Sequence, residues 1–270
     1  MNVTINYHIA EYRPLNGLIL RSTIKNAKRN QTSSIQKGDK RMKILAIVGA
    51  GKGLGLSLAK RFGKEGFQVA LIARNAVKLQ EMEDELKAAG IEASSFTADI
   101  YSKEQIEQAI TGIKAKYGKI DVLEFSPTPG NFPPTSVLEL TVENARDQFE
   151  GYVVSAINVV NAVLPDMLAR KEGSLLFTTG LSAMYPVPMM GNIGIAMSGL
   201  RNYIANLHSE LSPKGIFVSH RSLGLFMKET GAGTFDDPDV IANMWYQAYV
   251  EKNVWEEEYP KGVSPQTVVF

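Results

Sequence analysis

The sequence predicts an α/β fold: a single domain built on a doubly wound parallel sheet with helices on both faces. From Met42 onward, short apolar segments alternate with longer amphipathic segments. Three of the longer segments carry apolar residues at helical spacing and end in a glycine, at Gly66, Gly90 and Gly118. This repeated alternation favours parallel strands, because parallel neighbours need a crossover and a helix is the usual one.

The expected elements follow one another in a regular order. The strands are short apolar runs at 43–48, 67–73, 91–98, 120–125, 173–179 and 215–220. The first helices are amphipathic segments at 54–66, 75–90 and 102–118, and two longer helices are expected at about 142–170 and 193–212. A further helix is expected after Asp237, because Pro238 suits a first helical turn.

Charge divides the chain into two parts. The 270 residues have a net charge of +1, but residues 1–41 carry +6 and residues 42–270 carry −5. Residues 1–41 are basic, largely polar and without helical or strand periodicity, so we expect a disordered extension. One interpretation has Met42 as the natural start; the other has the basic segment contacting nucleic acid or an anionic surface. The first is favoured, so no nucleic-acid partner is expected.

Composition excludes several classes of chemistry. The chain has no cysteine, which removes disulfides, thiolate metal sites and cysteine nucleophiles. Its three histidines, His8, His208 and His220, are too far apart for a local metal motif, so no metal is expected. No signal peptide is visible, and polar residues interrupt the most apolar stretch, 151–165. We therefore expect a cytoplasmic protein with no membrane partner.

A glycine-rich loop, residues 49–55 (GAGKGLG), lies between the first expected strand and the first expected helix. Glycines here allow a tight turn and let the backbone approach a pyrophosphate at the positive end of the helix. We expect Gly49, Gly53, Leu54 and Gly55 to contact such a group. The sequence therefore predicts a Rossmann-type, NAD(P)-binding domain over residues 42–270.

The spacing of this loop, GxxxGxG, resembles that of the short-chain dehydrogenase/reductase family. Further similarities over about 42–255 are TADI at 97–100, DVLEF at 121–125, AVLPDM at 162–167 and ELSPKGIFVSH at 210–220. The resemblance implies an oxidoreductase that acts on a small carbonyl, alcohol or enone. It also places three more residues at the cofactor: Asp99, Ile100 and Ser126.

The cofactor preference follows from charge. The ribose diol of NAD requires a carboxylate at the end of the second strand, whereas the 2′-phosphate of NADP requires cations. This chain has Arg74 there and no acid, and Lys52 lies within the glycine loop. In NADP-dependent members of the family, cations at these two positions face the 2′-phosphate. We therefore expect NADP(H), although both cations also fit an ordinary solvated surface.

The resemblance fails at the catalytic positions. The family uses an Asn-Ser-Tyr-Lys tetrad, and this chain contains no Tyr-x-x-x-Lys. The four positions fall on Tyr152, Gly180, Gly194 and Ser198. A phenol titrates near 10, so a tyrosine acts near neutrality only with a cation beside it. The chain is therefore expected to be an atypical family member.

Two functions remain open at this point. In the first, the protein is a reductase with an atypical site, for which Ser182 and Tyr185 are candidate catalytic residues. In the second, it is an inactive NADP(H)-binding module for regulation or interaction. His220, at the end of the sixth strand, is interpreted as structural. The resemblance implies a homodimer or homotetramer that pairs through the two long helices; the substrate is not predicted.

Overall fold

The computed structural model describes residues 42–228 and 230–264, so the extension predicted for residues 1–41 lies outside the described residues. The strands are β1 (Ile44–Val48), β2 (Gln68–Ala73), β3 (Ala93–Thr97), β4 (Val122–Phe125), β5 (Gly173–Gly180), β6 (Ile216–Leu223) and β7 (Glu256–Tyr259). The α-helices are α1 (Leu54–Gly63), α2 (Ala76–Ala88), α3 (Lys103–Tyr117), α4 (Val142–Phe149), α5 (Ser155–Arg170), α6 (Gly191–Leu211) and α7 (Pro238–Glu251). Short helical turns are η1 (Glu150–Val154), η2 (Leu181–Ala183), η3 (Pro188–Met190) and η4 (Ser212–Lys214).

The strands form one parallel sheet in the order β3-β2-β1-β4-β5-β6-β7. The order reverses between β1 and β4, so the loops that leave these two strands diverge to opposite sides and open a crevice. The predicted doubly wound parallel α/β fold is confirmed. Six of the strands lie where the sequence predicts them, and β7 is an addition.

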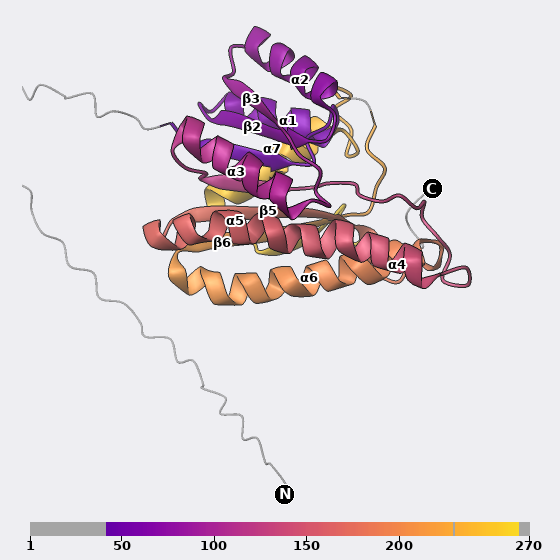
Figure 1. The fold of residues 1–270 in the computed structure, drawn as a ribbon. Helices are drawn as coiled ribbons and strands as arrows, with labels where there is room; N and C mark the ends of the chain where they lie inside the picture. Colours follow the sequence, from indigo (N-terminus) through magenta and orange to yellow (C-terminus); the bar gives the residue numbers. More distant parts are fainter. Residues whose placement is uncertain (1–41, 229, 265–270) are drawn as a thin grey trace, which may run out of the picture. The chain divides into compact units, whose positions relative to one another are not determined.

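Helices cover both faces of the sheet (Figure 1). The apolar residues of α1, α2 and α7 pack on one face, and those of α3, α5 and α6 pack on the other. Strand residues alternate between these two cores: Leu175 and Phe177 belong to the α5–α6 side, whereas Leu176 belongs to the α1–α7 side. Thr178 and Thr179 continue this alternation and therefore face opposite sides.

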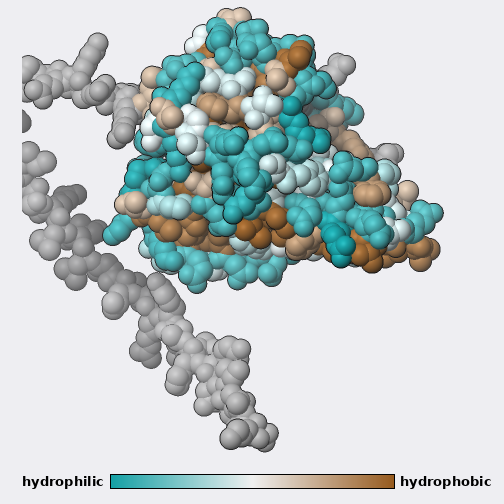
Figure 2. Space-filling model, viewed as in Figure 1, coloured by the Kyte–Doolittle hydropathy of each residue, from teal (hydrophilic) through white to brown (hydrophobic). Residues whose placement is uncertain are grey.

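The segment Val142–Arg170 is one continuous helical path through α4, η1 and α5, and it is long and apolar enough to cross a membrane by length and composition. In this structure Val159, Val163 and Met167 are buried in the core. Outward-facing Phe149 and Leu168 contribute to an apolar band along α4 and α5 (Figure 2). Packing against the sheet accounts for the buried part of the apolar composition of this helix.

The middle of that path is a π-helical turn, η1, which contains Gly151 and Tyr152. A side chain at Gly151 would collide with Pro129, because an added Cβ would lie 2.4 Å from the Pro129 Cβ. The glycine therefore lets the helix approach the loop that follows β4. The wider turn directs Tyr152 toward the carboxyl ends of the central strands.

Candidate active site

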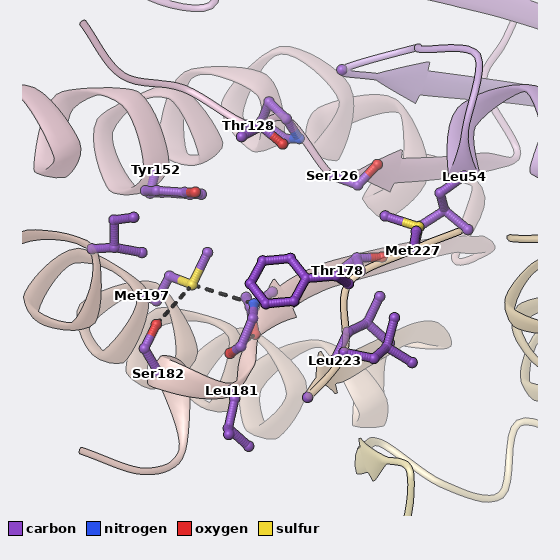
Figure 3. Close-up of a pocket in the computed structure, with 18 of the residues that line it drawn as sticks. Leu54, Ser126, Thr128, Tyr152, Thr178, Leu181, Ser182, Met197, Leu223 and Met227 are labelled. Atoms are coloured by element: carbon purple, nitrogen blue, oxygen red, sulfur yellow. Dashed lines mark hydrogen bonds between the residues drawn. The ribbon is translucent and has the colours of Figure 1, made fainter. Parts of the chain in front are cut away.

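A cavity of about 420 Å³ opens at the carboxyl ends of β1, β4, β5 and β6, where the strand order reverses (Figure 3). Ligands of doubly wound sheets bind at this position. Its polar side is made of the glycine loop and several hydroxyl-bearing side chains. Its apolar side contains Leu181, Val187, Met190, Ile193, Met197, Leu223, Leu225, Phe226 and Met227.

The glycine loop is held against the segment that follows β4. Gly49 has a φ of +92°, and an added Cβ would lie 2.5 Å from the Pro127 Cα. The amides of Gly49 and Ala50 both donate to the Ile72 carbonyl oxygen, at 2.9 and 3.0 Å. Gly55 lets α1 pack on the loop, since a Cβ there would lie 3.0 Å from the Ala50 Cα.

The other two glycines of the loop face open space. A Cβ added to Gly51 or Gly53 would have no heavy atom within 4 Å, and both residues line the cavity. No side chain caps the first turn of α1; the Leu56 amide donates to the Gly51 carbonyl oxygen at 2.9 Å, and the Leu54 and Gly55 amides remain available to a ligand. The bare backbone and the positive helix end suit a pyrophosphate. The residues present therefore fit the phosphates of a dinucleotide, with Gly49, Gly53, Leu54 and Gly55 at the cavity wall.

Both cations predicted to face a 2′-phosphate lie on the surface outside the cavity lining. Arg74 follows β2, is exposed, and makes no hydrogen bond or ion pair with any residue that the structure describes. Lys52 is also exposed, and its Nζ lies 2.7 Å from Glu81 Oε2, which raises the pKa of the lysine through the hydrogen bond to that carboxylate. Exposed pairs of this kind contribute little to stability, so a phosphate can displace Glu81 at small cost.

The remaining cofactor residues predicted from the sequence follow the strands β3 and β4. Asp99 and Ile100 follow β3 and do not line the cavity; Asp99 Oδ1 accepts a hydrogen bond of 3.1 Å from the Tyr101 amide. Ser126 follows β4, lines the cavity, and donates from Oγ to Glu124 Oε2 at 2.9 Å. The structure thus brings Ser126 next to the glycine loop. Asp99 lies outside the cavity lining, after the edge strand β3.

The cavity is uncharged. Among the described residues that line it, Tyr152 carries the single ionisable side chain. Burial raises the pKa of the Tyr152 hydroxyl well above its usual range, and the nearby Tyr101 adds to the effect. A tyrosine with this shift holds its proton throughout the neutral range and is a poor acid there.

The positions of the missing tetrad lie on the cavity wall or beside Ser182. Tyr152 and Gly180 line the cavity, while Ser198 Oγ donates to the Ser182 carbonyl oxygen at 3.3 Å. A Cβ at Gly194 would lie 3.8 Å from the Ser182 Cβ, an ordinary contact. The sulfur of Met197 accepts hydrogen bonds from the Gly180 amide at 3.3 Å and from Ser182 Oγ at 3.4 Å (Figure 3).

Tyr185, the other candidate catalytic residue, points elsewhere. It does not line the cavity, and its hydroxyl donates to Glu258 Oε2 at 2.5 Å. This hydrogen bond raises the pKa of Tyr185, the opposite of what an acid-base tyrosine needs. The structure places Ser182, rather than Tyr185, beside the cavity.

Sequence reasoning missed a buried carboxyl under the cavity. Glu124, in β4, is fully buried and accepts hydrogen bonds of 2.9 Å from Ser126 Oγ and from Thr178 Oγ1. Thr178 in turn accepts 3.0 Å from the Trp245 indole. Burial raises the pKa of Glu124 to about 8, although the two hydroxyl groups oppose the effect, so this carboxyl is protonated at neutral pH.

Sequence reasoning also missed a second group of polar side chains, which begins at the opposite face of β5. Thr179 lines the cavity, and its Oγ1 lies 2.7 Å from His220 Nε2. The ring is fully buried, and His220 Nδ1 lies 3.0 Å from Glu256 Oε1. Arg201 binds Glu256 with two hydrogen bonds, of 2.7 and 2.6 Å, and with His220 it lowers the pKa of Glu256 to about 2.

No side-chain cluster in residues 42–228 and 230–264 brings together three histidine or acidic groups in a metal-binding arrangement. The sequence-based expectation that no metal takes part stays a prediction.

The fold, the glycine loop and the cavity together define a nucleotide-binding α/β domain, and comparison with known proteins gives its family. The family model for the short chain dehydrogenases matches residues 43–237. The chain therefore belongs to the short-chain dehydrogenase family, as the sequence motifs predict.

Individual relatives are distant. A short chain dehydrogenase of Pseudocercospora fijiensis is 26% identical over 202 residues, which cover 73% of this chain and 63% of that protein. A 3-oxoacyl-[acyl-carrier-protein] reductase of Staphylococcus epidermidis is 22% identical over 192 residues, covering 71% and 78% of the two chains. The match thus spans less than two thirds of the first of these relatives.

Solved structures have the same fold. A short-chain dehydrogenase from Rhodopseudomonas palustris superimposes with a TM-score of 0.69 at 25% identity, covering 80% of this chain and 97% of that one. L-sorbose reductase from Gluconobacter frateurii, solved with NADPH and L-sorbose, gives a TM-score of 0.71 at 20% identity, with coverages of 81% and 94%. A metagenomic short-chain oxidoreductase solved with NADP gives 0.69 at 23% identity, with coverages of 80% and 94%.

The glycine loop gives a first testable prediction. Gly49→Ala forces a Cβ into the Pro127 backbone at a positive φ, so we expect it to lower the free energy of unfolding by about 3 kcal/mol. Gly51→Ala places its Cβ in open space and should change stability by less than about 0.5 kcal/mol, while weakening NADPH binding. Urea unfolding and NADPH fluorescence titration measure the two effects. Equal stabilities of the two variants would contradict the packing at Pro127.

Glu124 gives a second prediction, about pH. Its pKa is 4.5 in the unfolded chain and about 8 in the folded one, so the folded state binds more protons between these values and stability falls as pH rises. From pH 5 to pH 8 we expect a loss of up to about 3 kcal/mol. Glu124→Gln keeps the shape and removes this titration. Urea unfolding at both pH values should therefore show a shallower decline in the variant, and parallel declines would refute the buried neutral carboxyl.

Proposed function

We propose that the protein binds NADP(H) and reduces a small uncharged carbonyl compound or enone, or oxidises the corresponding alcohol, at an atypical site. The observation that carries the proposal is the glycine loop, which opens an uncapped helix end onto a cavity without charged walls. A pyrophosphate fits the uncapped helix end, and an apolar, neutral substrate fits the cavity.

The preference for NADP(H) over NAD(H) is supported by Arg74 and Lys52. Arg74 has no competing partner among the described residues, and its guanidinium can grip a phosphate with two parallel hydrogen bonds. Lys52 adds a point charge once it leaves Glu81. Two structural neighbours, the metagenomic oxidoreductase and L-sorbose reductase, were solved with NADP or NADPH, which agrees with this assignment.

Bound NADPH supplies a hydride, so the protein must hold the substrate, exclude water and supply a proton. The apolar side of the cavity, from Leu181 to Met227, excludes water from the substrate. The hydroxyl groups of Ser182 and Thr179 lie on the cavity wall, where a substrate carbonyl oxygen can replace their present acceptors, the Met197 sulfur at 3.4 Å and the Gly180 carbonyl oxygen at 3.4 Å. The chain contains no Tyr-x-x-x-Lys to supply the proton in the way usual for the family.

A second candidate function, an inactive NADP(H)-binding module, is favoured by one specific contact. The Met197 sulfur occupies the hydrogen-bond positions of the Gly180 amide and of Ser182 Oγ, two groups that would otherwise face a substrate. In this alternative, cofactor binding shapes a surface that a partner protein recognises. Sustained oxidation of NADPH by the purified protein with a carbonyl substrate excludes it.

Assembly and location stay as predicted from the sequence. The apolar band on α4 and α5, with Phe149 and Leu168 exposed, supports pairing through the long helices into a homodimer or homotetramer. Sedimentation velocity decides between these states. A cytoplasmic location remains a prediction from the sequence.

The cofactor assignment predicts a selective effect of Arg74. Arg74→Ala removes the phosphate ligand, so NADPH affinity should fall about tenfold or more while NADH affinity stays within twofold. Fluorescence titration with each dinucleotide measures both values. Lys64→Ala removes an exposed cation at the far end of α1 and should change neither. Equal losses for NADPH and NADH would contradict the assignment.

Three of the family's catalytic residues can be restored by substitution. Cβ atoms at Gly180 and Gly194 would make only ordinary contacts, at 3.5 and 3.8 Å, so Gly180→Ser with Gly194→Tyr and Ser198→Lys should fold. The restored lysine would lower the pKa of the new tyrosine, and the rate of NADPH-dependent reduction of 4-nitrobenzaldehyde should rise at least tenfold. The control lacks Ser198→Lys and should gain less. A folded, NADPH-binding triple variant with no gain would show that the nicotinamide does not lie beside position 194.

A further inference from the structure

The cavity contains six hydroxyl-bearing side chains, and one of them is connected to an imidazole. These are Ser126, Thr128, Tyr152, Thr178, Thr179 and Ser182. Ser126 and Thr178 donate to Glu124, and Ser182 donates to the Met197 sulfur. Thr179 differs, because its Oγ1 lies 2.7 Å from His220 Nε2.

We propose that Thr179 donates the proton to the substrate oxygen and that His220, held by Glu256, resupplies it through the Thr179 hydroxyl. This inference rests on the reductase function proposed above. It assigns the proton-donor role, which the missing tyrosine and lysine leave open, to a different pair of side chains.

The geometry provides each part of such a relay. A hydroxyl group alone is a weak acid, but a hydroxyl hydrogen-bonded to an imidazolium can give up its proton while receiving another. The imidazole must be oriented, and here Glu256 Oε1 lies 3.0 Å from Nδ1, which fixes that nitrogen as the protonated one. A hydroxyl, an imidazole and a carboxylate in this order also make up the serine hydrolase triad.

The groups around His220 can compensate a positive charge on its ring. Glu256 from β7 is the acidic group facing the ring, and β5 contributes the neutral Thr179. Arg201 from α6 reaches the ring only through Glu256, whose two oxygens it binds. Because the bidentate arginine keeps Glu256 ionised, a carboxylate is always beside the buried ring and compensates a positive charge there.

The proton balance of the reduction is complete. As the carbonyl carbon accepts hydride, the electrons of the carbonyl π bond move to its oxygen, and that oxygen takes the proton of Thr179 Oγ1. The threonine oxygen takes the proton of His220 Nε2, which leaves a neutral ring with its Nδ1 proton still on the Glu256 side. One proton from water then restores the ring, so each cycle consumes one NADPH and one proton. In the oxidative direction the same steps run backward.

The test compares isosteric and conservative variants. Thr179→Val keeps the shape and removes the hydroxyl, Thr179→Ser retains it, and His220→Gln removes the imidazole. We expect Thr179→Val and His220→Gln to lower kcat for 4-nitrobenzaldehyde about 100-fold, and Thr179→Ser to lower it less than fivefold. NADPH affinity, measured by fluorescence titration, should stay within twofold in all three.

Two further measurements separate a relay from structural support. In the wild type, kcat should fall as pH rises, because the relay loses its proton, and this dependence should vanish in His220→Gln. In the cofactor-free protein, the ¹⁵N resonance of His220 Nε2 should move in Thr179→Val and stay in place in Thr179→Ser. His208→Gln, which changes a histidine stacked on Trp255 at 5.0 Å, is the matched control and should change neither measurement.

The outcomes are distinguishable. Reduction that continues unchanged in folded Thr179→Val overturns the relay and leaves the proposed function intact. NADPH that binds with no reduction of 4-nitrobenzaldehyde or of a series of neutral ketones and enones overturns the reductase function, and the relay with it. A His220 resonance that is indifferent to Thr179→Val overturns the hydrogen bond on which the relay depends.

Discussion

The contact between the backbones of Gly49 and Pro127 is the constraint on which the candidate site depends. At this point the loop after β1 and the segment after β4 leave neighbouring strands, and an added Cβ would lie 2.5 Å from the Pro127 Cα. The Ile72 carbonyl ties the same loop to β2. The positions of the uncapped helix end, of Ser126 and of Arg74 are therefore set relative to one another by main-chain packing.

Most of the fold is predictable from the sequence because its signals are local. Alternating apolar strands and amphipathic helices give six strands and the order of the layers. β7 is different: its sequence, EEEY, has no apolar alternation, and its glutamates pair with residues distant in sequence. Glu256 binds Arg201, Glu257 binds Arg221 and Glu258 accepts from Tyr185. Such a strand can be recognised only from its pairing with β6 in the folded structure.

The site also has parts with local sequence signals and parts that form only from residues distant in sequence. The glycine loop can be found in the sequence because its ligand-binding groups are backbone amides of consecutive residues. The groups beneath the cavity cannot, since Glu124 meets Thr178 and His220 meets Glu256 only after folding. The interpretation of His220 as structural follows from its sequence position alone, whereas the contact with Thr179 supports the chemical role proposed above. Two carboxyls also differ by environment: burial keeps Glu124 protonated, and Arg201 keeps the half-buried Glu256 ionised.

β7 lies at one edge of the sheet and carries three consecutive carboxylates directed to both of its faces. Charged side chains along an edge strand disfavour the addition of a strand from another molecule, and here two of the three carboxylates are held in place by Arg201 and Arg221. Glu256 belongs to this edge and also orients the imidazole beside the cavity. A substitution that neutralises it would therefore alter both the resistance of the sheet to aggregation and the chemistry of the cavity.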